Sequence, residues 1–370
     1  MSDDDDIVRR RLGNQSLRGT VLDVPQDVVG RLVAVQAQDP GPAKWSIGRR
    51  MTRATEAQLD RAYADGAILR THVLRPTWHF VRPQDIRVLL AATAPRVRAR
   101  MASRRRQLGL DDAALERSRA LLAAALRGGR HVTRAEAAAL LSEGGVGVAG
   151  QRLPHILMDA ELHALICSGV PRGKHHTWAL LDERAPGARV VSRARAVAEL
   201  TRRYFFSHGP ATAKDLAAWA TLAMSDVRAG IAAAGARLRS EEFGGLLYWS
   251  AASGSGGAGP GDPGATGPTV HLLQGYDEYV MGYRETRHLL ALPGSSWSPS
   301  TPPVFSLVML IDGRMAGTWR RTTVRGRVLV EVAPLEPLDA GQRQALEEET
   351  ARYGEFLGVA ISVQVRPPEQ

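Results

Sequence analysis

The sequence predicts an α+β protein made of three tandem winged helix-turn-helix units followed by a C-terminal, small β-barrel-like domain. Three helices followed by two short strands recur along residues 1–250, and this order of elements is typical of winged helix-turn-helix units. A segment rich in glycine and proline follows, and beyond it apolar residues alternate as they do in strands. We place the units at 1–110, 111–190 and 191–250, a flexible loop at 251–268, and the β domain at 269–370.

The first unit is the least regular of the three copies. Asp23 begins a predicted helix that runs to about residue 37, and Thr55 caps another helix that ends near Gly66. Alternating residues over 68–74 and 77–81 predict two strands joined by a tight connection.

The second and third units share a capping box at the start of their middle helix. Thr133 is followed three residues later by Glu136, and Thr212 by Asp215, so side chain and backbone can satisfy each other at both helix starts. The helices of these units are predicted at 112–126, from 133, at 151–160, at 193–206, from 212, and at 224–234. Their strands are predicted at 162–167, 177–181, 237–240 and 246–250.

The last third of the chain is predicted to be mainly β. Residues 251–268 hold seven glycines and three prolines and almost no apolar side chains, which indicates a flexible loop or linker. Strands are predicted at 269–273, 303–311, 314–320, 328–332 and 359–365, with one helix at 340–356 before the last strand. This pattern predicts a small β-barrel or sandwich over 269–370.

The composition excludes several classes of protein. The chain has one cysteine, Cys167, so it forms neither an intramolecular disulfide nor a cysteine-cluster metal site, and its scattered histidines lack the spacing of metal ligands. No run of apolar residues is long enough to span a membrane, and the acidic N-terminus is unlike a secretory signal. Phosphate-binding and dinucleotide-binding glycine motifs are absent from the sequence. We therefore expect a cytoplasmic protein without a metal, a cofactor or a membrane partner.

The charge points to a polyanionic partner. Lysine and arginine together number 48 against 38 acidic residues, a net charge of +10, and residues 1–110 contribute 20 basic and 11 acidic residues. A basic patch in the first third predicts binding to DNA or RNA through phosphates. An ordinary solvated arginine surface is the alternative, because only three of the basic residues are lysines and GC-rich codons favour arginine.

The segment from Val33 to Pro40 is the most informative one. Gln36 and Gln38 are separated by about 200° on an ideal helix, so both face one way only if the helix ends before them. Pro40 disfavours helical backbone at the residue before it, and an unwound helix end would present both amides on one concave surface. Two polar residues at a helix end, one solvated and one capping, are the structural alternative.

Four motifs resemble the winged-helix DNA glycosylase family that includes AlkZ and YcaQ. They are Ala34-Val35-Gln36-Ala37-Gln38-Asp39, Arg75-Pro76-Thr77-Trp78-His79-Phe80-Val81, Gly275-Tyr276-Asp277-Glu278-Tyr279-Val280-Met281-Gly282-Tyr283, and Asp312-Gly313-Arg314 with Gly317-Thr318-Trp319-Arg320. The similarity spans residues 20–360, approximately. In that family the Gln-x-Gln motif belongs to the AlkZ-like branch and Gln-x-Asp to the YcaQ-like branch, so this chain resembles the AlkZ-like branch.

This resemblance implies a DNA glycosylase in which Gln36 and Gln38 are the catalytic residues. It implies hydrolysis of the bond between an alkylated guanine and its deoxyribose, with N7 adducts or interstrand crosslinks from DNA-alkylating antibiotics as the lesions. The partner is then double-stranded DNA containing alkylated guanine, and the role is self-resistance and DNA repair at a bacterial nucleoid. We expect a monofunctional, monomeric enzyme, and Lys44 is the only lysine near the glutamines that lyase chemistry would use.

Glutamine suits a cationic substrate. A glycosidic bond breaks through an oxocarbenium-like transition state, and an amide cannot ionise to act as a strong base. It can accept a hydrogen bond from water and direct its carbonyl dipole at the positive sugar. Because N7-alkylguanine leaves as a neutral base, we expect activity on cationic purines and little or none on undamaged guanine or uracil. Asp39 is the rival carboxylate, but its place before Pro40 favours a turn away from the site.

We expect phosphate contacts to dominate DNA binding. The candidates are Lys44, Arg49, Arg50 and Arg53 after the glutamine segment, and Arg320, Arg321, Arg325 and Arg327 on a hairpin around Gly326. Solvated arginine faces are the alternative for both clusters, and the second wing tip at 174–176 is a weaker candidate. Because aromatic residues are few, we expect an open concave surface that leaves the lesion in the duplex rather than a tight base pocket.

Two other functions fit the same residues. A non-catalytic winged-helix transcription regulator would bind a specific sequence and be indifferent to the loss of Gln36 or Gln38. A protein that sequesters the antibiotic or its adduct would bind the adduct tightly and form no abasic product.

Overall fold

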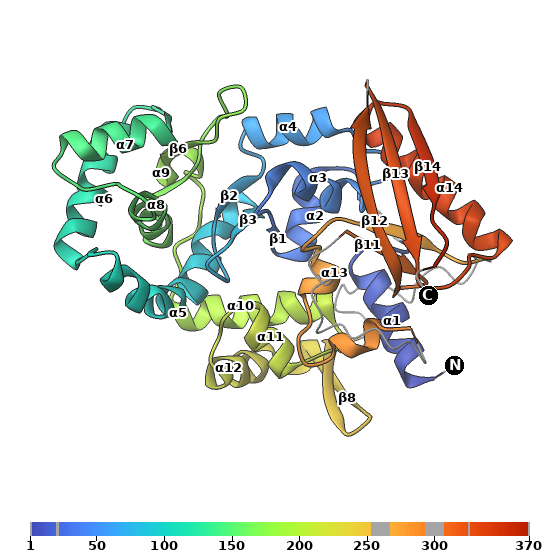
Figure 1. The fold of residues 1–370 in the computed structure, drawn as a ribbon. Coiled ribbons are helices and arrows are strands. Elements are labelled where there is room, and N and C mark those ends of the chain that lie inside the picture. Colours follow the sequence, from blue (N-terminus) through green and yellow to red (C-terminus); the bar gives the residue numbers. More distant parts are fainter. Residues whose placement is uncertain (1, 20–21, 253–266, 293–306, 325, 369–370) are drawn as a thin grey trace.

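The computed structural model describes residues 2–19, 22–252, 267–292, 307–324 and 326–368, and its architecture is α+β, as predicted. Within these residues, helices surround three three-stranded sheets and one five-stranded sheet. None of their helices is long and apolar enough to cross a membrane. Figure 1 shows the first unit in the centre, with the second unit on one side and the C-terminal sheet on the other. The strand that carries Gln36 therefore lies in the middle of the molecule.

The first unit surrounds a sheet with the strand order β1-β3-β2. Its elements are α1 (Asp3–Asn14), α2 (Pro25–Leu32), β1 (Val35–Gln36), α3 (Pro40–Gly48), α4 (Glu56–Ala64), β2 (Leu69–His72), β3 (Trp78–Val81), a 3-10 turn at Pro83–Asp85 and α5 (Ile86–Gln107). Thr55 caps α4 as predicted, accepting from the backbone N–H of Gln58. The helices α1, α3 and α5 were not predicted, and α5 contains Pro95, a residue that ordinarily disfavours a helix interior.

The helix predicted to run to about residue 37 ends earlier, at Leu32. The next residue, Val33, has a positive φ of 76° with a ψ of −49°, and a β-branched residue rarely adopts a positive φ. The chain then becomes extended, and Gln36 pairs with His79 of β3. Pairing with the sheet therefore replaces the helix that the apolar stripe predicted.

The second and third units repeat one plan. The second contains α6 (Asp112–Leu126), β4 (Val132–Thr133), α7 (Arg134–Glu143), α8 (Arg152–Leu162), β5 (Ile166–Ser168), β6 (Thr177–Leu180) and α9 (Leu181–Arg184). The third contains α10 (Arg193–His208), β7 (Ala211–Thr212), α11 (Ala213–Trp219), α12 (Met224–Ala234), a 3-10 turn at Gly235–Arg237, β8 (Leu238–Phe243) and β9 (Leu246–Ala251). Both predicted capping boxes are present, and the sheet orders β4-β6-β5 and β7-β9-β8 match that of the first unit. The unit boundaries stay a prediction.

The C-terminal domain contains an open mixed sheet. The strands β10 (Val270–Leu273), β11 (Val308–Ile311), β12 (Arg314–Val324), β13 (Arg327–Pro334) and β14 (Ile361–Val365) lie in that order, with α13 (Glu278–Met281), a 3-10 turn at Arg287–Leu290 and α14 (Ala340–Leu357) between them. The last pair is parallel because α14 forms the crossover between β13 and β14. In the described residues β10 and β14 are the two edges of this sheet. Most of the predicted loop at 251–268 lies outside the described residues.

The first unit shares its hydrophobic core with the C-terminal domain. Leu32 and Trp45 of α2 and α3 belong to one cluster with Val330 of β13 and Phe356 of α14, and the ring centroids of Trp45 and Phe356 are 5.1 Å apart. A second cluster joins α5 to α10 of the third unit. Burial of apolar surface is worth about 25 cal/mol per Å², so these two cores hold the first unit, and β1 within it, between its neighbours.

Candidate active site

Gln36 and Gln38 lie in the short non-helical segment that joins α2 to α3. Gln36 pairs with His79, and the backbone N–H of Ala37 donates to the carbonyl oxygen of Trp78 at 2.8 Å. Gln36 ends β1 and Gln38 lies in the bend that follows it. The helix that would have turned the two side chains away from each other has therefore ended before both of them.

The first unit differs from the other two at this segment. In the second and third units the short strand ends at Thr133 and Thr212, and these same residues are the N-caps of the next helix. In the first unit Gln36 ends the strand, but the N-cap of α3 is Asp39. The intervening residues lengthen the junction and carry the second glutamine, Gln38.

Gln36 is fixed at both its backbone and its side chain. It is 3% exposed. Its backbone N–H donates to Glu278 Oε1 at 2.8 Å, and its Oε1 accepts from Arg75 Nη2 at 2.7 Å. Arg75 also donates to the carbonyl oxygen of Trp219 at 2.8 Å and lies 3.1 Å from His79 Nε2. Residues from three distant parts of the sequence thus meet at this one glutamine.

Gln38 is exposed, and its backbone is held more firmly than its side chain. Its Oε1 accepts from the backbone N–H of Trp78 at 3.3 Å. Arg70 donates to the carbonyl oxygens of Ala37 and Gln38 at 2.9 and 3.1 Å, and its guanidinium lies 4.2 Å from the Trp78 ring centroid. The Gln38 amide is therefore reachable from outside while the backbone beneath it is fixed.

The titratable groups around Gln36 keep one protonation state near neutral pH. Burial by itself raises the pKa of Glu278, but the neighbouring His208 and the charge of Arg75 outweigh it and lower that pKa to about 2. Burial and the charge of Arg75 lower the pKa of His79 to about 3. The site therefore presents an ionised carboxylate, a guanidinium, a neutral imidazole and two amides at pH 7.

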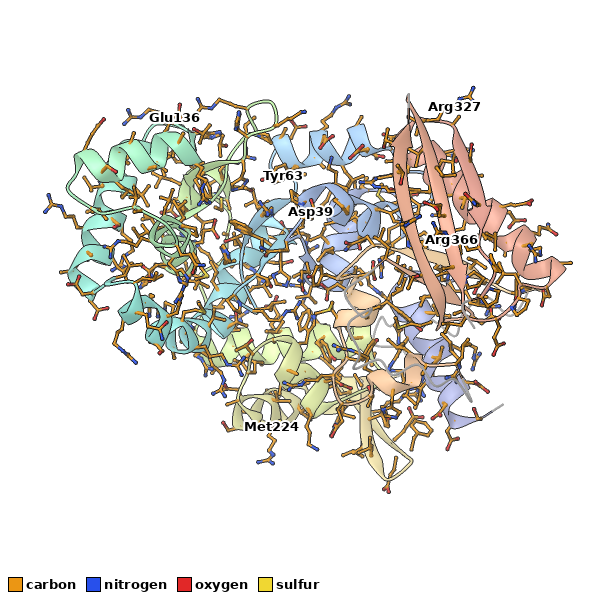
Figure 2. All side chains as sticks on the ribbon, in the orientation of Figure 1. Asp39, Tyr63, Glu136, Met224, Arg327 and Arg366 are labelled. Atoms are coloured by element: carbon orange, nitrogen blue, oxygen red, sulfur yellow. The ribbon has the colours of Figure 1, made fainter. Side chains whose placement is uncertain are left out.

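Asp39 serves the start of α3. Its Oδ1 accepts from the backbone N–H of Gly41 at 3.3 Å, as an N-cap does. Figure 2 shows Asp39 near the middle of the molecule, between the second unit and the C-terminal sheet. In the part of the chain that the structure describes, no group of three or more histidine, cysteine or acidic side chains could hold a metal ion.

Two of the predicted DNA contacts are buried, and the prediction is wrong for them. Arg50 is 0% exposed, forms two hydrogen bonds with Asp277 at 2.7 and 2.9 Å, and donates to the carbonyl oxygen of Gln15. Arg49 is 7% exposed and pairs with Glu349 at 2.7 Å. Guanidinium groups enclosed by protein partners cannot reach a DNA phosphate, so these two arginines stabilise the contact between α3 and the C-terminal domain.

The other predicted arginine contacts lie at the surface where the structure describes them. Arg53 follows α3, and Arg327 begins β13 at the end of the β12–β13 hairpin (Figure 2). Arg320 is exposed, but its guanidinium donates hydrogen bonds of 2.6 and 2.7 Å to the carboxylate of Glu331, which lies opposite it on β13. Arg321 donates to a tyrosine hydroxyl of α14, and Arg325 lies outside the described residues.

Lys44 and one residue of the second wing tip interact with other side chains of the protein. Lys44 forms ion pairs with Glu56 and Asp60 at 2.9 and 2.7 Å. Burial alone would lower the pKa of Lys44, but these carboxylates outweigh it and raise that pKa. At the wing tip, Lys174 and His175 are exposed, whereas His176 lies within hydrogen-bonding distance of Tyr63 of α4.

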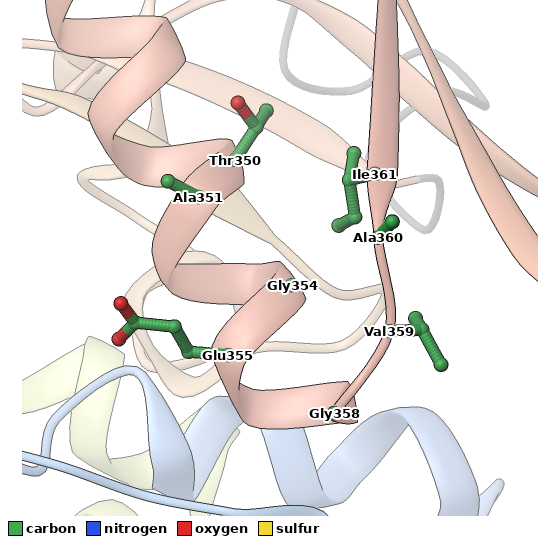
Figure 3. Close-up of a pocket in the computed structure, with 8 residues that line it drawn as sticks. All are labelled: Thr350, Ala351, Gly354, Glu355, Gly358, Val359, Ala360 and Ile361. Atoms are coloured by element: carbon green, nitrogen blue, oxygen red, sulfur yellow. The ribbon is translucent and has the colours of Figure 1, made fainter.

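A pocket of about 420 Å³ opens elsewhere, between α14 and the start of β14 (Figure 3). Its lining residues are Thr350, Ala351, Gly354, Glu355, Gly358, Val359, Ala360 and Ile361. Neither glutamine lines it, and Figure 3 shows mainly short or apolar side chains around it. This pocket does not contain the residues that carry the predicted chemistry.

Four residues that contact or surround Gln36 have no role assigned from the sequence. Arg75, His79 and Glu278 are positions of the family motifs, and Trp219 belongs to the apolar side of a predicted helix. The sequence signal that could have identified them is that two of them, Arg75 and Glu278, are charged residues within the motifs that resemble the glycosylase family. Their contacts with Gln36 depend on how the units pack, which the local sequence does not specify.

Comparison with known proteins points to one family over most of the chain. The family model described as DNA glycosylase AlkZ-like matches residues 29–356. A Streptomyces sahachiroi protein named interstrand DNA cross-link repair glycosylase is 24% identical over 363 residues, 95% of this chain and 95% of that protein. The solved structure of Streptomyces sahachiroi DNA glycosylase AlkZ matches with a TM-score of 0.79 and 21% identity, covering 99% of this chain and 100% of that one. This likeness shows that the fold is shared.

Proposed function

The chain belongs to the AlkZ-like DNA glycosylase family, and we propose that it hydrolyses the N-glycosidic bond of N7-alkylguanine in double-stranded DNA. The observation that carries the proposal is the arrangement of Gln36 and Gln38. They lie two residues apart in the non-helical segment between α2 and α3, and one is anchored in the interior while the other is exposed. We propose these two residues as the catalytic pair.

The two amide oxygens suit a leaving group that is already cationic. Each amide oxygen has two acceptor sites, and Arg75 or the Trp78 backbone uses one on each glutamine. The second site on Gln38 accepts a hydrogen bond from the attacking water, and its carbonyl dipole stabilises the positive charge that develops on the sugar. Because N7-alkylguanine leaves as a neutral base, the reaction needs no proton donor, and the proton that the attacking water loses passes to the bulk solvent.

We propose that the DNA contacts are Lys44, Arg53, Arg320, Arg321, Arg325 and Arg327. The exposed positions of Arg53 and Arg327 support this proposal. Figure 1 shows the β12–β13 hairpin extending to the upper end of the C-terminal sheet. Lys44 and Arg320 would exchange a carboxylate partner for a phosphate, so we expect smaller contributions from them than from Arg53 and Arg327.

We propose hydrolysis alone, without strand cleavage by a lyase step. Lyase chemistry requires an uncharged amine that attacks the sugar. The carboxylates of Glu56 and Asp60 hold Lys44 in its ammonium form, and the chain contains only two other lysines. The expected product is therefore an intact strand with an abasic site.

We propose bulky N7 adducts or interstrand crosslinks from a DNA-alkylating antibiotic as the natural lesions. The name of the Streptomyces relative, a cross-link repair glycosylase, supports this choice. The exposure of Gln38 supports an open surface that acts on a lesion within the duplex. We further propose that the protein acts as a monomer at the bacterial nucleoid and gives self-resistance to such an antibiotic.

The test is base release from three duplexes, which carry one N7-methylguanine, one N7 interstrand crosslink, or one uracil. Hot alkali cuts the strand at each abasic site. We expect cleavage of the first duplex, unhooking of the second and no reaction of the third. Tight binding without an abasic product would support sequestration, and sequence-specific binding without a product would support a regulator. Either result contradicts the proposed function.

A further inference from the structure

We propose that Arg75 and Glu278 are positioning residues that act through Gln36. The third unit and the C-terminal domain then support residues 33–39, the catalytic segment, which carries both glutamines. This inference rests on the proposed function and deepens it, because it names residues that neither contact the substrate nor belong to the glutamine motif. A closed ring of hydrogen bonds around Gln36 carries it.

The ring passes through residues from three parts of the chain. The backbone N–H of Gln36 donates to Glu278 Oε1 at 2.8 Å, and Trp219 Nε1–H donates to Glu278 Oε2 at 2.7 Å. Arg75 Nη2–H donates to Gln36 Oε1 at 2.7 Å, and Arg75 Nη1–H donates to the carbonyl oxygen of Trp219 at 2.8 Å. Each residue is held by two others, and Gln36 is held at its backbone and at its side chain.

Glu278 occupies a position where a carboxylate is costly. It is 0% exposed, and among the described residues no arginine or lysine pairs with it directly, while His208 Nε2 lies 3.9 Å away. The adjacent Asp277 is instead paired with Arg50. A buried carboxylate without a paired cation must satisfy its oxygens through hydrogen bonds. Those bonds go to Gln36 and Trp219, so the charge of Glu278 is used to hold the catalytic segment.

Arg75 selects the orientation of the Gln36 amide. With Oε1 facing the guanidinium, the amide is in the orientation that pairs a donor with an acceptor, whereas a flipped amide would place two donors against each other. His79 Nε2, 3.1 Å from Arg75 Nη2, restrains the guanidinium from a further side. Because catalysis by an amide depends on the direction of its dipole, this restraint is a requirement for the reaction.

A ring with only a structural role would stabilise the packing of the units and affect the reaction equally whether or not Gln36 is present. A positioning role acts through Gln36 and disappears with it. A double-mutant cycle separates the two roles, because two residues that act through the same group have non-additive effects.

The experiment measures single-turnover base release from a duplex carrying one N7-methylguanine, with the rate and the half-saturating protein concentration determined separately. We expect Glu278→Gln and Arg75→Lys each to lower the rate by about 10- to 100-fold and to change the half-saturating concentration less than about twofold. In the Gln36→Ala background we expect either change to lower the rate by less than about twofold further. Equal losses in both backgrounds would overturn the inference.

Glu349→Gln is the matched control. Glu349 is also a buried carboxylate that accepts a backbone N–H, from Leu272, and a guanidinium N–H, from Arg49, but it lies in the C-terminal core. We expect this substitution to lower the thermal midpoint and to leave the rate of the folded protein unchanged. A loss of rate like that of Glu278→Gln would show that any damaged buried carboxylate slows the reaction, and would overturn the inference.

A second measurement does not depend on activity. In protein labelled with 15N-glutamine, the side-chain amide signals of Gln36 and Gln38 are assigned from the two alanine variants. We expect Arg75→Lys to move the Gln36 signal and to leave the Gln38 signal in place. An unmoved Gln36 signal overturns the inference. Absence of base release by the unmodified protein overturns the proposed function instead, and the amide signals then decide separately whether Arg75 orients Gln36.

Discussion

Gln36 and Gln38 are two residues apart, yet they lie in opposite surroundings. Gln36 is 3% exposed and is bonded to a carboxylate and a guanidinium from distant segments. Gln38 is exposed, and its amide accepts one hydrogen bond from the backbone of Trp78. The two residues therefore have different properties: the Gln36 side chain is fixed inside the protein, and the Gln38 side chain is open to solvent. Gln36 anchors the segment to the protein interior, and Gln38 presents an amide that solvent and substrate can reach.

The first prediction removes the exposed amide. Because Gln38 is the residue that we propose to orient the water, and because it has few contacts with the protein, Gln38→Ala should lower the rate of base release by about 100- to 1000-fold. The free energy of unfolding should change by no more than about 0.5 kcal/mol. Single-turnover assays and urea denaturation measure the two quantities. A large loss of stability would show that Gln38 is also a structural residue, and the division between the glutamines would then be incorrect.

The second prediction removes the buried amide. Gln36→Ala should lower the rate by about 10- to 100-fold and should also lower the free energy of unfolding by about 1–3 kcal/mol. The stability is lost because the buried donor of Arg75 is left without its acceptor. The same two assays apply, with Gln38→Ala as the matched control. Equal stability of the two alanine variants would contradict the comparison.

The third prediction concerns the support beneath Gln38. Arg70 donates to two backbone carbonyl oxygens and covers the Trp78 ring, and a lysine ammonium cannot reproduce that planar arrangement. Arg70→Lys should therefore lower the rate by about tenfold, less than the loss of the Gln38 amide itself. Adding Arg70→Lys to Gln38→Ala should have little further effect. Additive losses would mean that Arg70 contributes independently of Gln38.

The fourth prediction extends the comparison to two nearby arginines. Arg53 is exposed, whereas Arg50 is enclosed and paired with Asp277. Arg53→Ala should weaken DNA binding and reduce the slope of log affinity against log salt by about 1, without loss of stability. Arg228→Ala, an exposed position on α12, is the control that should leave the slope unchanged. Titrations at several salt concentrations measure it, and equal slopes for both variants would remove Arg53 from the DNA surface.

The smallest expected effect is that of pH on the rate. The pKa of Glu278 is lowered to about 2 and that of His79 to about 3, so neither group titrates near neutrality. The rate of base release should be flat between about pH 6 and 9. A change in the rate of base release centred near pH 7 would indicate a general base other than the glutamines.

The stability at acid pH follows from the same shifts. The pKa of Glu278 is depressed from 4.5 to about 2, so the ionised carboxylate stabilises the folded protein above pH 4.5, and this stabilisation is lost as the pH falls toward 2. Glu278→Gln should therefore be less sensitive to acid over this range than the unmodified protein. Denaturation at several pH values tests this sign.

Local signals in the sequence predicted much of the fold. The capping boxes at Thr133 and Thr212 and the helix cap at Thr55 are all present, because these signals act within one helical turn. The helix at 224–234 and the hairpin around Gly244 were also predicted. The parallel pairing of β14 with β13 was not predicted, since it depends on a crossover that alternation does not reveal.

The site was predicted less completely, for a physical reason. The motif located Gln36 and Gln38, but the end of α2 at Leu32 depends on pairing with β3 rather than on the local sequence. Arg49 and Arg50 were expected to contact DNA because a run of arginines looks the same whether it is buried or exposed. Their acidic partners lie more than 200 residues away in the sequence, so only the folded chain shows them.

The most direct test compares the unmodified protein with the Gln36→Ala/Gln38→Ala double variant on a duplex carrying one N7-alkylguanine. Base release is followed by alkaline cleavage, and DNA binding is measured in parallel. We predict rapid formation of abasic sites by the unmodified protein, and loss of that reaction with retained DNA binding in the double variant. An equal rate of base release by the double variant would contradict the assignment of catalysis to this segment.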